Sequence, residues 1–353
     1  LTTAQLASLT DDKLANLSTS AVAALGVKQI PAMSSTQWAA ISSTTLRALT
    51  ASQIGRMETR DVAALTSNSI AALRSEQVQA LSISQIAGLT TQQVFDLNST
   101  TLRTLTVKQI ASIETRDIAV LAAARLDALS STQILALTDG QIKALTTTQV
   151  NGINSTTLRT LDLDQIRVLE TSDVAALTSN NIAALTSLQL RVLSPTQVSS
   201  FTTDQLSSLS TTTLALLTAS QMGGLSVEKI NNLGTTKVAV LSATQVGGFS
   251  TTQVSGLSTG ALKALNTSAI AVLSASQIKS LTTTQAASIT TTTLGALKAA
   301  QIGFLETQDL AALSSTALGA LSGAQAAGLT TAQLASLTDD KLANLSTSAV
   351  AAL

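Results

Sequence analysis

The chain contains no cysteine, no histidine and no tyrosine among its 353 residues. The absence of cysteine excludes a disulfide framework and thiol chemistry. The absence of histidine and cysteine together removes the most common general base and the soft metal ligands. The sequence also contains no glycine-rich phosphate loop. We therefore expect a protein that is not an enzyme, with no catalytic residue, no cofactor and no metal centre.

Charged residues are also scarce, at 11% of the chain, whereas an average globular domain has roughly 25%. The 20 basic and 20 acidic residues cancel, so the formal net charge is zero. Nucleic acids and anionic membrane surfaces attract proteins with a basic excess, and we expect neither as a partner. No apolar run approaches the roughly 18 residues of a membrane-spanning helix, so we expect no membrane insertion. A weakly charged, neutral surface does little to oppose self-association.

Aromatic residues make up only 1% of the chain, although apolar residues make up 45%. The core is therefore built from Leu, Ile, Val and Ala. These residues recur in a unit of eight: Leu, Ser/Thr, any, any, Gln, Ile/Val/Leu, any, small. Forty-four such octads fill residues 1–352 without a change of register, and Leu353 begins another. The unbroken period predicts one continuous repeat array over residues 1–353 rather than two or three ordinary domains.

The spacing within the octad excludes a continuous helix and a simple strand. A continuous α-helix turns by 100° per residue, so its apolar stripe would drift by about 80° with every octad. The apolar spacings of five and three residues break the alternation of a strand. By contrast, Ser/Thr at position 2 and Gln at position 5 match a capping box, and positions 1 and 6 match the accompanying hydrophobic staple. Pro195 fits this register, because it falls at the first helical position, where proline is favoured.

Each octad is expected to form a short helix of about six residues, which is marginal on its own in water. The helices must therefore stack, and we expect an all-α solenoid of short capped octapeptide helices wound into a superhelix. Positions 1 and 6 point inward, and the small residue at position 8 lets neighbours approach closely. The alternative is a β-solenoid with 16-residue coils, which suits the Ser/Thr content but not the Ala, Leu and Gln content. We expect residues 25–40, including Trp38, to be irregular, because Gly26 replaces the cap and Pro31 falls inside the predicted helix.

Two longer periods are superimposed on the octad. Ser-Thr-Thr-Leu-Arg recurs every 56 residues, or seven octads, and ends at Arg47, Arg103 and Arg159. We interpret seven octads as close to a whole number of superhelical turns, which would align these arginines. Residues 329–353 also repeat residues 1–25 without one change, 328 residues later. This copy predicts a 328-residue macro-repeat of a longer protein.

Four carboxylate pairs with the spacing Glu-x-x-Asp recur along the chain. In each pair, a glutamate at position 2 precedes an aspartate at position 5. The pairs are Glu58/Asp61, Glu114/Asp117, Glu170/Asp173 and Glu306/Asp309. Weak Ca²⁺ binding is one interpretation, but the pairs lack the Asp-rich, Gly-punctuated loop of a dedicated calcium site. We favour the alternative that they replace the Ser/Thr and Gln of the capping box and complement the helix dipole.

The run of L-[ST]-x-x-Q-[IV]-x-[AG] units resembles the octapeptide-repeat regions of very large, low-complexity bacterial cell-surface or secreted structural proteins. The resemblance covers the whole chain, implies an extracellular or cell-surface location, and assigns no functional residues. We favour a structural protein that forms the shaft of an extracellular filament, sheath or fibre by repeat stacking and self-association. The alternatives are the passive stalk of a giant bacterial adhesin and a solenoid module that binds a peptide or glycan.

Overall fold

The computed structural model describes residues 1–353, except for the side chain of Ala15. The described residues form short helices joined by brief connections, and no strand occurs among them. The chain divides into two compact units, Leu1–Leu177 and Thr178–Leu353. The prediction of an all-α fold is confirmed, and the alternative of a β-solenoid is wrong.

The α-helices are four to six residues long, and the first unit also contains one 3₁₀ helix, η1. The helices of the first unit are α1 Thr3–Ala7, α2 Asp11–Ala15, α3 Thr19–Ala23, η1 Ile30–Ala32, α4 Ser35–Ala40, α5 Ser43–Ala48, α6 Ala51–Ile54, α7 Thr59–Ala64, α8 Ser67–Ala71, α9 Ser75–Ala80, α10 Ile83–Ala87, α11 Thr91–Asp96, α12 Ser99–Thr104, α13 Val107–Ser112, α14 Thr115–Ile118, α15 Ala123–Leu126, α16 Ser131–Ile134, α17 Asp139–Lys143, α18 Thr147–Gly152, α19 Ser155–Thr160, α20 Leu163–Val168 and α21 Thr171–Ala176. The helices of the second unit are α22 Ser179–Ala184, α23 Ser187–Val192, α24 Pro195–Ser199, α25 Thr203–Ser208, α26 Thr211–Leu214, α27 Ala219–Gly223, α28 Val227–Asn231, α29 Thr235–Val238, α30 Ala243–Gly247, α31 Thr251–Gly256, α32 Thr259–Ala264, α33 Thr267–Ile270, α34 Ala275–Lys279, α35 Thr283–Ala287, α36 Thr291–Gly295, α37 Ala299–Gly303, α38 Thr307–Ala312, α39 Ser315–Gly319, α40 Gly323–Ala326, α41 Thr331–Ala335, α42 Asp339–Ala343 and α43 Thr347–Val350.

Most helices begin directly after a Ser, Thr or Asn at position 2 of the octad. In α1, the Thr2 hydroxyl accepts a hydrogen bond from the Gln5 backbone N–H at 3.2 Å, and Gln5 Oε1 accepts one from the Thr2 N–H at 2.8 Å. The capping box predicted from the sequence is therefore present. Pro195 occupies the first position of α24, where its missing N–H leaves no intrahelical hydrogen bond unmade.

The leucine at position 1 ends one helix and leads into the next. The Leu49 N–H donates to the Leu46 carbonyl oxygen at 3.2 Å and closes the last turn of α5. Leu49 then turns to extended backbone, with φ −61° and ψ 146°, and the cap of α6 follows at Thr50. Leu49 is fully buried, as is Ile54, which lies at position 6 of the same octad and ends α6. Positions 1 and 6 thus form the core, as predicted.

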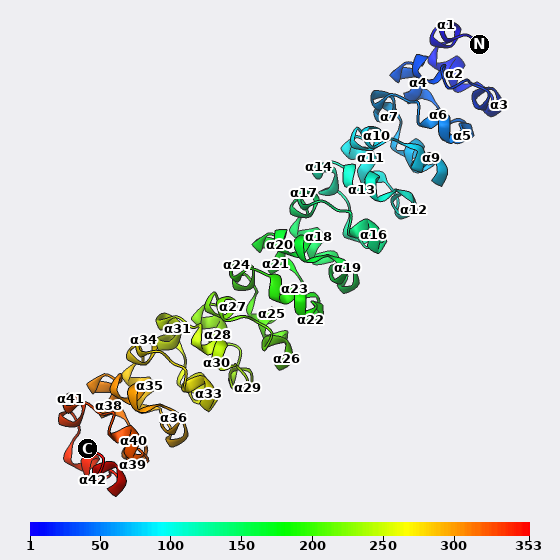
Figure 1. Ribbon diagram of the computed structural model, residues 1–353. Helices are drawn as coiled ribbons and strands as arrows, with labels where there is room; N and C mark the ends of the chain where they lie inside the picture. The colour runs from blue at the N-terminus through cyan, green and yellow to red at the C-terminus, as the bar shows by residue number, and fades with distance from the viewer. The chain divides into compact units, whose positions relative to one another are not determined.

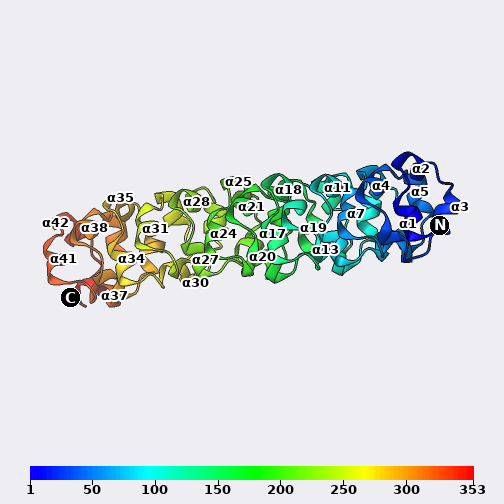
Figure 2. The ribbon, with the colours of Figure 1, turned by 90° about the horizontal axis from the view of Figure 1, so that it is seen from above.

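Helices three octads apart pack against one another in both units. In the first unit α4 contacts α7 and α18 contacts α21, and in the second unit α27 contacts α30 and α35 contacts α38. Within each unit, successive turns of the chain therefore lie one on the next, as Figure 1 and Figure 2 show from two directions. This arrangement is a solenoid, in which each short helix is held by the turns before and after it.

The small residue at position 8 lies against position 3 of an octad in the preceding turn, which is the first residue of a helix. A methyl group added at Gly248 would come within 2.8 Å of the Ala219 carbonyl oxygen. At Gly256, it would meet the Val227 side chain at 2.6 Å. The structure therefore confirms that small residues at position 8 permit a close approach of neighbouring turns.

The irregular stretch is shorter than the sequence predicted. It contains η1, which has Pro31 in its first turn. However, α4 is a regular α-helix and contains the fully buried Trp38. The prediction was therefore wrong for residues 34–40. The reason is that Ser34 and Gln37 form a complete capping box, which restarts the helix whatever conformation precedes it.

The sequence separation between bonded residues gives the length of one turn. Side-chain hydrogen bonds between turns join residues 25 to 31 positions apart, with 28 at the centre of the range. Because 28 residues are three and a half octads, seven octads make two turns. Arg47, Arg103 and Arg159 therefore fall at the same place in every second turn of the first unit. This spacing supports the interpretation of the 56-residue period.

Candidate functional site

The most regular polar feature of the structure is a series of buried glutamine side chains at position 5. We call this series the glutamine ladder. Its members with described bonds to the preceding turn are Gln37, Gln53, Gln77, Gln85, Gln93, Gln109, Gln133, Gln141, Gln149 and Gln165 in the first unit, and Gln221, Gln245, Gln253, Gln277, Gln285, Gln301, Gln325 and Gln333 in the second.

Each ladder amide joins its own helix to the preceding turn. In Gln149, Oε1 accepts a hydrogen bond from the Thr146 N–H at 2.7 Å, while Nε2 donates to the Ile118 and Leu121 carbonyl oxygens, each at 2.7 Å. These oxygens lie at and just beyond the end of α14, where helical carbonyl groups have no intrahelical partner. One side chain thus caps the start of one helix and the end of another.

The sequence predicted the capping half of this geometry but not the half that links the turns. A capping box accepts either glutamate or glutamine, yet glutamate does not occur at position 5 of any octad. Only the amide carries the N–H donors that two carbonyl oxygens require. The exclusion of glutamate from position 5 is therefore the sequence signal for the ladder.

Basic residues at position 5 reach the preceding turn in a similar way. Lys237 Nζ donates to the Ser207 carbonyl oxygen, and Arg125 Nη1 donates to the Phe95 carbonyl oxygen, each 30 residues earlier. The Arg125 guanidinium also lies 5.8 Å from the centroid of the Phe95 ring, which is a cation–π distance. A longer donor can therefore take the place of the ladder amide.

The aspartates of the four carboxylate pairs interrupt the ladder with a side chain that cannot donate when ionised. Asp61 and Asp309 are fully buried. Ser35 Oγ donates to Asp61 Oδ1 at 2.8 Å, and Thr283 Oγ1 donates to Asp309 Oδ1 at 2.9 Å. The second carboxylate oxygen of each aspartate is buried without a hydrogen-bond partner in the described part of the chain.

Three of the four glutamates of the pairs do not cap their helices as predicted. Glu58, Glu114 and Glu306 occupy the N-cap positions of α7, α14 and α38, but in the described structure their side chains make no capping hydrogen bond. Glu58 instead pairs with Arg60 at 2.8 Å, and Arg60 Nε lies 3.7 Å from Asp61 Oδ1. The prediction that glutamate replaces the Ser/Thr cap is therefore wrong here. At Glu58 the reason is that the longer carboxylate turns to an exposed arginine.

Burial raises the pKa of Asp61, Asp173 and Asp309, because desolvation disfavours the charged carboxylate. In Asp309, the hydroxyl hydrogen bond opposes this rise, whereas the negative charge of Glu306 adds to it. In Asp173, the Glu170 N–H opposes the rise by donating to Oδ2 at 3.2 Å. At these octads, a buried acid thus stands where the ladder has a neutral amide.

We expect Asp309→Gln to stabilise the second unit by about 1–3 kcal/mol at neutral pH, because it replaces a buried carboxylate with the ladder amide. The new amide would have the Ile278 and Leu281 carbonyl oxygens, the position-6 and position-1 groups of the preceding turn, as acceptors. The substitution should also reduce the pH dependence of stability. Because the folded-state pKa of Asp309 is raised, its contribution is fully present below the ordinary aspartate pKa and is lost as pH rises through the folded value.

Urea denaturation at several pH values measures both effects of Asp309→Gln. Asp204→Gln is the matched control, because Asp204 is an exposed acid in the first turn of α25. It should change the free energy of unfolding by less than about 1 kcal/mol. An Asp309→Gln variant that is less stable than the parent at neutral pH would contradict the prediction, as would an unchanged pH dependence.

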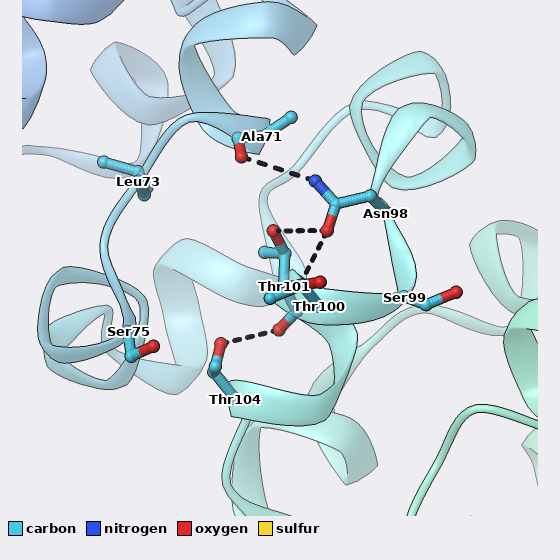
Figure 3. A pocket seen from close by; sticks show the side chains of 8 residues that line it. All are labelled: Ala71, Leu73, Ser75, Asn98, Ser99, Thr100, Thr101 and Thr104. Atoms are coloured by element: carbon cyan, nitrogen blue, oxygen red, sulfur yellow. Dashed lines mark hydrogen bonds between the residues drawn. The ribbon is translucent and has the colours of Figure 1, made fainter.

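A cavity of about 410 Å³ lies between turns of the first unit. Asn98 Oδ1 accepts a hydrogen bond from the Thr101 N–H at 2.9 Å, Asn98 Nδ2 donates to the Ala71 carbonyl oxygen at 3.4 Å, and Thr104 Oγ1 donates to the Thr101 carbonyl oxygen at 2.7 Å (Figure 3). No charged residue is among those that line the cavity. These polar groups are hydrogen-bonded within their own helix or to a neighbouring helix. The residues that line the cavity include no acid–base pair.

The described residues bring together no group of three or more His, Cys, Asp or Glu side chains that could hold a metal ion. In the Glu58/Asp61 pair, the exposed carboxylate is already paired with Arg60. Within the described residues, no third carboxylate joins a pair to complete the weak Ca²⁺ site that was one interpretation of the sequence. None of the described helices has the length and apolar character needed to cross a membrane.

Four segments of the chain match the family model of the ALTTAQ repeat: residues 54–91, 110–147, 166–203 and 302–339. Every match begins at position 6 of an octad, and the first three begin 56 residues apart. No curated protein matches the chain significantly. The matches share the register of the stacked octads, so the chain is a repeat protein in which these four segments are similar to the ALTTAQ repeat.

Proposed function

We propose that the chain is a structural protein that forms the shaft of an extracellular filament, sheath or fibre by repeat stacking and self-association. The observation that carries this proposal is the glutamine ladder, which ties each turn to the preceding turn by buried hydrogen bonds. The acceptors are backbone carbonyl oxygens, so the link does not depend on the side chains of the preceding turn. Such an array holds its form without a ligand, a metal ion or a disulfide.

The surface chemistry supports association between copies of the chain. The formal net charge is zero, so little long-range repulsion keeps copies apart. Large apolar side chains are exposed at several points, among them Ile83, Val107 and Leu135 in the first unit and Leu188 and Val272 in the second. Burying these side chains against a second copy would add the hydrophobic effect to association.

We extend the proposal to the location and the partner of the chain. The resemblance to octapeptide-repeat regions of large bacterial surface proteins supports an extracellular or cell-surface location. The lack of histidine, cysteine and tyrosine supports a non-enzymatic role without a cofactor. The partner in this proposal is a second copy of the chain rather than a nucleic acid or a membrane.

The purified chain should assemble into regular fibres as its concentration rises. Sedimentation velocity over a wide concentration range, with negative-stain microscopy of the same samples, measures this assembly. Raised salt should weaken assembly little, because few charges are available for screening. Monodisperse single chains at the highest concentration would contradict the proposal and favour a passive stalk.

A further inference from the structure

One octad of the second unit, residues 233–240, departs from the repeat pattern at both of its capping positions. Its sequence is Leu-Gly-Thr-Thr-Lys-Val-Ala-Val, so Gly234 stands at position 2 and Lys237 at position 5. Gly234 is the N-cap of α29 but makes no side-chain capping bond, and its φ of 77° is the only positive φ among the described residues. A side chain at Gly234 would meet no described atom within 4 Å, so packing does not require glycine there. We call residues 233–240 the uncapped octad.

The uncapped octad has no ladder amide to join it to the preceding turn. Lys237 Nζ donates to the Ser207 carbonyl oxygen, but an ammonium group has no acceptor for the N–H at position 2. The Lys237 side chain is only partly buried and its ammonium is strongly hydrated, so water competes for this hydrogen bond. The octad therefore depends on one solvent-accessible hydrogen bond where a ladder octad has buried ones.

The following turn does not supply the missing bonds at the start of the octad. The ladder spacing of 28 residues places Ala261 opposite the Leu233 carbonyl oxygen, and alanine has no side-chain donor. Asn266 Nδ2 reaches only the end of the octad, where it donates to the Ala239 carbonyl oxygen at 3.1 Å, and the Leu241 carbonyl oxygen beyond it at 2.7 Å. The part of the octad that lacks a cap thus also lacks an amide donor from the next turn.

The next octad, residues 241–248, has the bonds that the uncapped octad lacks. The Ser242 hydroxyl accepts a hydrogen bond from the Gln245 N–H at 3.2 Å, and Gln245 Oε1 accepts one from the Ser242 N–H at 2.9 Å. Gln245 Nε2 donates to the Leu214 and Leu217 carbonyl oxygens, each at 2.9 Å. Positions 1 and 6 are buried in both octads. The two octads therefore differ in their hydrogen bonds rather than in their apolar core.

We propose that the uncapped octad is a built-in opening point, which leaves the stack while the turns on either side of it stay folded. Local opening begins where a segment has few buried hydrogen bonds. Each turn of a solenoid contacts only its neighbours, so one octad can open without unfolding the whole array. Once open, its eight residues reach at most about 26–29 Å, which would let the array lengthen under load.

Hydrogen exchange followed by mass spectrometry tests the proposal on the single full chain at low concentration. After correction for the intrinsic rate of each amide, α29 should exchange at least about tenfold faster than α30. The double substitution Gly234→Ser and Lys237→Gln turns the uncapped octad into the regular Leu-Ser-Thr-Thr-Gln-Val-Ala-Val. This repaired variant should slow exchange in α29 to the rate of α30 and leave α36 unchanged.

The reverse change in the neighbouring octad is the matched control. Ser242→Gly together with Gln245→Lys gives residues 241–248 the two capping residues of the uncapped octad, so exchange in α30 should rise at least about tenfold. Equal exchange of α29 and α30 in the parent would overturn the proposal, as would a repaired variant in which α29 exchanges as fast as before. If the repaired variant does not fold, the reverse variant decides, and unchanged exchange in its α30 overturns the proposal.

Limited digestion with trypsin provides a second measurement on the chain without substitutions. Lys279 is exposed and Lys237 is only partly buried, so exposure alone would place the earlier cut after Lys279. However, Lys279 lies in α34, which has a complete capping box. Opening of the uncapped octad would instead place the earlier cut after Lys237. An earlier cut after Lys279 would count against the proposal.

This inference goes beyond the proposed function, because a single chain opens in the same place whether or not it assembles. Fast exchange in α29 of a chain that stays single at every concentration supports the opening point and contradicts the filament. Fibres formed by a chain in which α29 and α30 exchange equally slowly support the filament and overturn the opening point.

Discussion

Gln149→Glu is expected to lower the free energy of unfolding of its segment by about 3–5 kcal/mol. Glutamate has nearly the shape of glutamine, so the packing of α18 is preserved. The Ile118 and Leu121 carbonyl oxygens lose their donors at 2.7 Å, and a negative charge is buried against them. An unpaired buried carboxylate favours its protonated form. The variant should therefore regain part of its stability in mild acid.

Gln79→Glu is the matched control for Gln149→Glu. Gln79 lies in α9 of the same unit, at position 7 of its octad, and is exposed. The same chemical change there should alter stability by no more than about 0.5 kcal/mol. Similar destabilisation by the two substitutions would show that added charge, rather than loss of the ladder bonds, causes the effect.

The loss caused by Gln149→Glu should also be local. Each turn of a solenoid contacts only its neighbours, so the array does not unfold as one cooperative block. Hydrogen exchange followed by mass spectrometry should show faster exchange in α14 and α18, with little change in α4. Uniformly faster exchange throughout the first unit would contradict this expectation.

Gly248→Ala is expected to destabilise the second unit by about 1–3 kcal/mol, although alanine is the better helix former. Its methyl group would lie 2.8 Å from the Ala219 carbonyl oxygen, which is backbone and cannot rotate away. Two adjacent turns would therefore have to separate. The φ of −81° at Gly248 suits any residue, so the effect is one of contact rather than of backbone strain.

Gly295→Ala provides the opposite result at a site without this contact. A methyl group at Gly295 would meet no described atom within 4 Å, and Gly295 is the last residue of α36. We expect a gain of about 0.5–1 kcal/mol, because alanine loses less backbone entropy in a helix. Urea denaturation of the two variants measures the contrast. The prediction fails if both substitutions change stability in the same direction.

Local rules predicted most of the fold. Ser/Thr at position 2 and Gln at position 5 placed the helix starts, and Pro195 confirmed the register at α24. The same rules failed where one local signal overrode another. Pro31 and Gly26 suggested irregularity up to Ala40, but the cap at Ser34 restarts the helix sooner. Glu58 has the position of a cap but makes an ion pair with Arg60 instead.

The ladder hydrogen bonds that link two turns could not be predicted from the octad. Predicting them requires the number of residues in a turn, which no single octad specifies. Gln149 bonds to carbonyl oxygens 28 and 31 residues earlier, and that separation depends on how the helices stack. The burial of Asp61 and Asp309 could not be predicted from the sequence for the same reason. Their position in the octad was visible in the sequence, but the carbonyl-lined surface facing position 5 belongs to another turn.

The acceptors of the ladder are backbone oxygens, and every octad offers them whatever its side chains. Octads are therefore interchangeable, and the chain can gain or lose length in steps of eight residues without a new contact having to arise. An insertion of any other length would move the position 5 amide out of register with the turn before it. Genetic recombination between octads can thus lengthen or shorten the array, and the identical residues 1–25 and 329–353 are the kind of trace that such recombination leaves.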